Sequence, residues 1–122
     1  MPRLTRFLSD RLKSFGYAFN GLVLLIKKEV NFQIQLCCAV AICVVGALVG
    51  LSTSEWIGQF LAIGLVLAAE ALNTAIERLA DQVTKDQNKQ IGQLKDVAAA
   101  APLVASIIAV IIALLIYLPK IS

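Results

Sequence analysis

Three long apolar stretches stand out in the pattern of hydrophobic and polar positions along the chain. They cover residues 32–51, 56–76 and 97–118, and each is close to the ~20 residues that a helix needs to cross a bilayer. Backbone groups in lipid have to be satisfied within their own segment, so these stretches predict helices and not open strands. The pattern therefore predicts an all-α membrane protein, with three transmembrane helices in a single domain spanning residues 1–122.

The segment before the first apolar stretch, 1–28, has a different pattern. Apolar residues recur there at roughly helical spacing, between basic and polar positions. They are Leu4, Phe7, Leu8, Leu12, Phe15 and Phe19. This spacing favours an amphipathic helix that lies on the membrane surface, and the alternative is a helix that only packs against the bundle. A signal peptide is not indicated, because the basic residues are spread through the segment and no compact apolar core follows them.

Composition and charge add an orientation to this picture. Of the 122 residues, 59% are hydrophobic, which is more than a small soluble domain carries. Six of the 11 Lys and Arg residues precede the first apolar stretch, four lie within 78–96, and Lys120 is the last. The positive-inside rule places the N-terminus and the 78–96 connection in the cytoplasm and the C-terminus outside. The basic residues fit lipid headgroups better than nucleic acid, so we expect no nucleic-acid partner.

The stretch "EALNTAIERLAD", residues 70–81, places polar groups where the second apolar stretch continues. Glu70, Asn73, Glu77 and Asp81 stand at offsets of 0, 3, 7 and 11, which share one helix face at roughly 100° per residue. An ionisable side chain inside a bilayer costs at least ~2.5 kcal/mol, so Glu70 calls for a functional explanation. Asp81 lies nearer the surface, where an ordinary interfacial charge is the alternative.

Further polar residues are expected at the same cytoplasmic level. Glu29 precedes the first apolar stretch, and Lys95 and Asp96 precede the third. Magnesium prefers a few carboxylates together with substrate phosphates, and a lysine provides a point charge for phosphate. The set is therefore compatible with a site for Mg²⁺ and phosphate, or with plain interfacial charges. No P-loop, dinucleotide or protein-kinase motif is present, and the chain has no histidine.

These motifs resemble one known family. "EALNTAIERLAD", "KDVAAAA" 14 residues later, "SFGYAFNGL" and Glu29 are together similar to the prokaryotic integral-membrane diacylglycerol kinase and undecaprenol kinase family. The resemblance implies a homotrimer in the bacterial inner (cytoplasmic) membrane, with each subunit built from a surface helix and three membrane helices. It also implies transfer of phosphate from ATP, with Mg²⁺, to a lipid alcohol at the cytoplasmic interface.

The resemblance further implies roles for individual residues. Glu70 matches the general base on the lipid hydroxyl, and Glu29 and Glu77 match carboxylates that hold Mg²⁺ with the nucleotide. The matches to nucleotide-binding positions are Tyr17, Asn73, Asp86, Gln87, Asn88, Lys95 and Asp96, and Asp81 is a possible addition.

Some positions depart from the family pattern. Gln33 and Gln35 replace charged residues, and Pro102 is expected to remove a backbone donor from the third membrane helix and to kink it.

The sequence thus predicts an ATP-dependent membrane lipid kinase, with undecaprenol and diacylglycerol both open as substrates. A small multidrug or ion transporter with one membrane glutamate is the alternative. The three spans and the polar 78–96 connection argue against it. A non-catalytic structural membrane protein would leave Glu70 unexplained.

Overall fold

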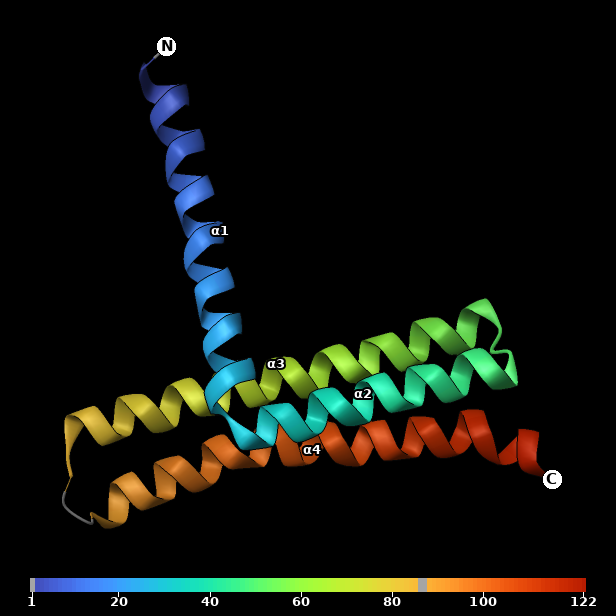
Figure 1. The fold of residues 1–122 in the computed structure, drawn as a ribbon. Coiled ribbons are helices and arrows are strands. Elements are labelled where there is room, and N and C mark those ends of the chain that lie inside the picture. The colour runs from blue at the N-terminus through green and yellow to red at the C-terminus, as the bar shows by residue number, and fades with distance from the viewer. Residues whose placement is uncertain (1, 86–87) are drawn as a thin grey trace.

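The structure, a computed structural model, describes residues 2–85 and 88–122, and that part of the chain forms four α-helices (Figure 1). Their bounds are Pro2–Lys28 (α1), Val30–Val49 (α2), Thr53–Val83 (α3) and Lys89–Ile121 (α4). Helices α2, α3 and α4 run alongside one another as a bundle, and α1 projects from the side of that bundle (Figure 1). The predicted all-α architecture is confirmed, and each of the three bundle helices is long and apolar enough to cross a membrane.

Helices α3 and α4 extend well beyond the predicted apolar spans. α3 has 31 residues, so at ~1.5 Å per residue it is roughly 46 Å long, against about 30 Å for the hydrocarbon core of a bilayer. No glycine or proline interrupts residues 77–83, and the helix continues to Val83. The polar residues at the end of α3 and the start of α4 therefore stand on helices, and only residues 84–88 connect the two. α4 also remains one helix through Pro102, which is buried.

The junction between α1 and α2 is a single non-helical residue. Glu29 has φ −108° and ψ 108°, and helix resumes at Val30. Lys27 and Lys28 form the last turn of α1, where cations interact favourably with the helix dipole. No residue of α1 is buried in the described chain. The membrane-surface location of this helix stays a prediction.

The α2–α3 turn and the C-terminus lie at the same end of the bundle, away from the end of α3 and the start of α4 (Figure 1). Gly50 ends α2 with a φ of +83°, a conformation that favours glycine. The Ser52 hydroxyl accepts a hydrogen bond from the backbone of Glu55, whose carboxylate accepts one from the Ser52 backbone, so a capping box starts α3. Lys120 Nζ lies 3.1 Å from Glu55 Oε1 and ties the end of α4 to this turn.

A polar cluster joins the three bundle helices near this end. Tyr117 Oη donates a hydrogen bond to Gln59 Oε1 at 2.6 Å and lies 3.2 Å from the Ile42 carbonyl oxygen, the other acceptor within reach of its single proton. Gly46 permits this approach, because a Cβ there would lie 3.1 Å from Tyr117 Oη and 2.9 Å from Leu51 Cδ1. Glycine at position 46 therefore lets Leu51 and Tyr117 come close to α2.

Large apolar side chains cover the outside of the bundle. Leu48, Leu61 and Leu115, one on each bundle helix, are 82%, 69% and 71% exposed in the single chain. A soluble monomer rarely presents apolar surface on this scale. The exposed faces fit a chain whose surroundings are lipid or other membrane-embedded protein.

Candidate functional site

Glu70 lies inside the bundle, on α3. It is only 4% exposed, and its Oε2 accepts a hydrogen bond from Gln35 Nε2 of α2 at 3.5 Å. The small residue Ala69 beside it is buried as well. Helices of the single chain therefore enclose this carboxylate.

One turn further along α3, Asn73 and Thr74 are also buried, with exposures of 5% and 6%. The amide Nδ2 of Asn73 donates to Glu77 Oε1 at 3.4 Å. Asn73 Oδ1 is buried and has no hydrogen-bond partner among the described residues. Because an unpaired buried acceptor is costly, this oxygen is a candidate ligand atom. Glu77 itself is exposed, so the predicted stripe runs from the bundle interior to its surface.

Glu29 reaches the same helix from the α1–α2 junction. Its Oε1 accepts from Arg78 Nη2 at 2.5 Å, and the two side chains are 29% and 49% exposed. Arg78 directly follows Glu77, so the ion pair brings the Glu29 carboxylate to the part of α3 that carries Asn73 and Glu77. The ion pair thus joins the Glu29 carboxylate to α3, the helix that also carries Glu77.

The facing ends of α3 and α4 form a polar hollow of about 850 Å³. Asp81 and Lys95 line it and pair with each other, with Lys95 Nζ 2.5 Å from Asp81 Oδ1. Lys85 and Lys89 contribute further positive charge to its wall. Asn88 also lines it, and its side chain accepts from the Gln90 backbone as the N-cap of α4. A hollow with three lysines has the charge needed to bind phosphate groups.

The other predicted site residues are not buried in the bundle or lie outside the described chain. Tyr17 on α1 is 72% exposed, and Asp96 on α4 is exposed as well. Asp86 and Gln87 lie outside the described residues.

The residues fit a magnesium ion bound with phosphate, although the described chain does not enclose one by itself. No group of three or more Cys, Asp or Glu side chains is close enough within residues 2–85 and 88–122 to hold a metal ion. Magnesium usually takes one or two carboxylates and completes its shell with water and substrate phosphate. Glu77, the unpartnered Asn73 Oδ1 and Glu29, which pairs with the neighbouring Arg78, offer oxygen atoms of this kind.

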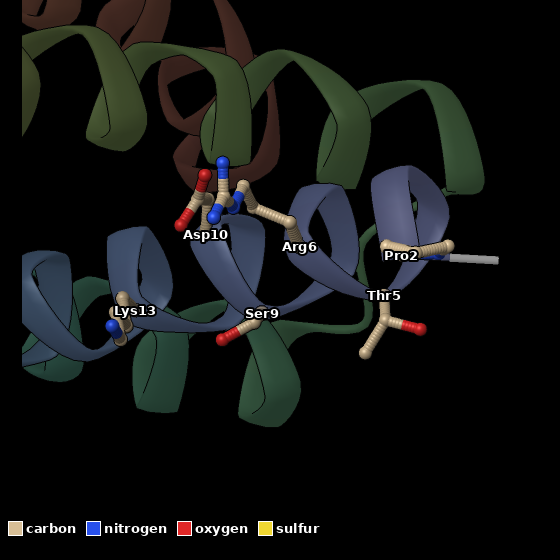
Figure 2. A pocket seen from close by; sticks show the side chains of 6 residues that line it. All are labelled: Pro2, Thr5, Arg6, Ser9, Asp10 and Lys13. Carbon is tan, nitrogen blue, oxygen red and sulfur yellow. The ribbon is translucent and has the colours of Figure 1, made fainter.

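A separate hollow on α1 does not belong to this site. Figure 2 shows its lining residues, which all come from α1 and include Arg6, Asp10 and Lys13. Because a single helix supplies every wall, the hollow is an open helix face and encloses no ligand.

Two residues of the site were not predicted from the sequence. Gln35 is the hydrogen-bond partner of Glu70, and the sequence had singled it out only as a polar position that departs from the family pattern. Arg78 pairs with Glu29 across 49 residues of sequence, and it had counted only as one of several cytoplasmic cations.

Comparison with known proteins agrees with the resemblance noted from the sequence. The family model described as prokaryotic diacylglycerol kinase matches residues 16–117. Undecaprenol kinase of Bacillus subtilis (strain 168) is 43% identical over 108 residues, which are 88% of this chain and 88% of that protein. Diacylglycerol kinase of Synechocystis sp. is 33% identical over 109 residues, which are 88% of this chain and 62% of that protein. Diacylglycerol kinase of Escherichia coli (strain K12) is 28% identical over 100 residues, 82% of each chain. The chain therefore belongs to the prokaryotic diacylglycerol kinase family of lipid kinases.

Proposed function

We propose that this lipid kinase transfers the γ-phosphoryl group of ATP to the hydroxyl of a membrane lipid alcohol, with undecaprenol preferred over diacylglycerol. The observation that carries the proposal is Glu70, a carboxylate 4% exposed inside an apolar bundle. The higher identity to an undecaprenol kinase than to the two diacylglycerol kinases supports the polyprenol.

In this proposal Glu70 is the general base. It accepts the proton of the lipid hydroxyl as the oxygen attacks the γ-phosphorus, and the bond from that phosphorus to the β,γ-bridging oxygen breaks. Gln35 holds the Glu70 carboxylate by donating to Oε2, which leaves Oε1 free for the hydroxyl. Phosphoryl transfer depends mainly on positioning and on neutralised charge, so a small helical site can support it.

The lipid chain has a path beside this base. An apolar groove of about 410 Å³ runs between α2, α3 and α4, from Gln35 to Ile116. Its walls include the small residues Ala39 and Ala109, which leave room for a hydrocarbon chain. Gln35 lines the groove and also contacts Glu70, so a chain in the groove would bring its alcohol end to the carboxylate.

The nucleotide side of the proposal uses the cytoplasmic ends of α3 and α4. The lysines of the polar hollow bind the phosphates, with Lys95 kept in place by Asp81. Glu29, Glu77 and Asn73 Oδ1 would hold Mg²⁺. When bound, Mg²⁺ neutralises charge on the phosphates. The N-terminus and the connection between α3 and α4 then face the cytoplasm, as the distribution of Lys and Arg indicates.

A test of this proposal is phosphate transfer from γ-labelled ATP in mixed micelles. Undecaprenol, diacylglycerol and a saturated long-chain alcohol are offered separately, with and without a magnesium chelator. We expect labelled undecaprenyl phosphate, less product from diacylglycerol, and none after chelation. Labelling of no lipid alcohol, with dissipation of an ion gradient in proteoliposomes, would support the transporter instead.

We also propose that the subunits form a homotrimer. The polar stripe on α3 supports association, because a charged residue within a membrane has to face protein or water, and Glu77 is exposed in the single chain. Crosslinking in lipid bilayers at increasing protein dilution checks this. Trimers should persist at the lowest protein-to-lipid ratio, and a purely monomeric pattern there would contradict the proposal.

A further inference from the structure

The ion pair between Arg78 and Glu29 occupies an unusual place in the fold. Glu29 is the one non-helical residue between α1 and α2. Its carboxylate pairs with Arg78 of α3, which lies 49 residues further along the sequence. Both side chains are partly exposed, at 49% for Arg78 and 29% for Glu29. Exposed ion pairs contribute little to the free energy of unfolding, so stabilisation of the fold does not account for this pair.

We propose that Arg78 is a positioning residue for phosphoryl transfer, which holds the Glu29 carboxylate against α3 before Mg-ATP binds. The inference rests on the proposed function, because Glu29 matters here as a ligand for the metal–nucleotide complex. Without a partner, a carboxylate at a non-helical junction would sample several rotamers, and each would place its charge differently relative to Glu77.

The ion pair leaves one oxygen of the Glu29 carboxylate available to bind a cation. Arg78 Nη2 contacts Oε1 of Glu29, and no described contact uses Oε2 of Glu29. A carboxylate has lone pairs on both oxygens, so Oε1 can accept from the guanidinium while Oε2 remains available to a cation. Positions 77 and 78 are separated by roughly 100° around the helix, so Arg78 can point to the α1–α2 junction while Glu77 stays on the polar stripe.

Arg78 stands where α1 passes α3. Arg78 lines a cavity of about 370 Å³ between α1 and α3, together with Gly21, Leu25 and the buried Thr74. Because Arg78 belongs to α3 and its guanidinium reaches the Glu29 carboxylate, the pair ties the junction to α3. Partners that orient a metal ligand in this way typically change metal affinity or activity 10- to 100-fold when they are removed.

The test compares Arg78→Gln with Lys27→Gln, which removes a positive charge two residues from Glu29 without touching the ion pair. In Arg78→Gln we expect the apparent KM for Mg-ATP to rise about 10- to 100-fold, with kcat changed far less. Lys27→Gln should leave both parameters near wild type. Arg78→Lys keeps a cationic donor and should recover most of the loss. An unchanged or lowered KM in Arg78→Gln would overturn the inference.

A second measurement needs no activity and no nucleotide. Hydrogen exchange of the backbone amides of Glu29 and Gln33, which bond to Leu25 and Glu29 across the junction, reports how firmly the junction is held. These amides should exchange faster in Arg78→Gln than in wild type and Lys27→Gln. Unchanged exchange would refute the positioning role. If wild-type protein labels no lipid alcohol, the proposed function fails, whereas the exchange result still decides whether Arg78 holds the junction.

Discussion

Replacing Glu70 by glutamine is the sharpest test of the chemistry. Glutamine has the same size, and its Oε1 can still accept the hydrogen bond from Gln35, so the packing of the bundle should change little. What is lost is the ability to take a proton. The next carboxylate on α3, Glu77, lies seven residues on, about 10 Å along the helix axis, and is too far to replace Glu70.

The expected loss of turnover is about 10²- to 10⁴-fold, the usual contribution of general-base catalysis. At about 1.4 kcal/mol per factor of ten, this is roughly 3 to 5 kcal/mol of activation free energy. The apparent KM for Mg-ATP should stay near wild type, because the proposed metal ligands are elsewhere on α3 and at the α1–α2 junction. Thermal stability should hold or rise, since burying an amide costs less than burying a charge.

The assay is steady-state phosphate transfer to undecaprenol in mixed micelles, with circular dichroism to verify the fold. Glu55→Gln is the matched control, because it makes the same change on the same helix and glutamine can keep the capping box. That control should retain wild-type turnover. Near-normal turnover in Glu70→Gln would reduce Glu70 to a buried polar contact and remove the main support for the mechanism.

Three further substitutions probe the nucleotide side and the packing. Glu77→Gln should raise the apparent KM for Mg-ATP, measured at several Mg²⁺ concentrations; an unchanged Mg²⁺ dependence would exclude Glu77 as a ligand. Gly46→Ala places a Cβ 2.9 Å from Leu51 and 3.1 Å from Tyr117 and should cost about 1–3 kcal/mol, seen as a lower melting temperature in micelles. Tyr117→Phe removes the donor to Gln59, which is 4% exposed, and should destabilise the bundle by about 1–3 kcal/mol; an unchanged melting temperature would show that water or lipid replaces this bond.

Much of the architecture could be predicted from local pattern. Hydropathy is a property of consecutive residues, so the three apolar stretches predicted three helices that the structure contains. The helix limits were less accurate, because apolar character ends where the membrane is expected to end, whereas helical hydrogen bonding continues until a breaker or cap stops it. This is why α3 runs to Val83 and α4 starts at Lys89.

The sequence by itself determined the helices, the polar stripe on α3 and the choice of Glu70, because a charge within an apolar run is visible without any tertiary contact. Only the tertiary structure decided the partners. Gln35 reaches Glu70 across 35 residues, and Arg78 reaches Glu29 across 49. Such pairs depend on how helices pack and rotate against one another, and helical periodicity within one segment carries no information about the facing segment. The stripe was therefore predictable, whereas the residues that hold its carboxylates in place were not.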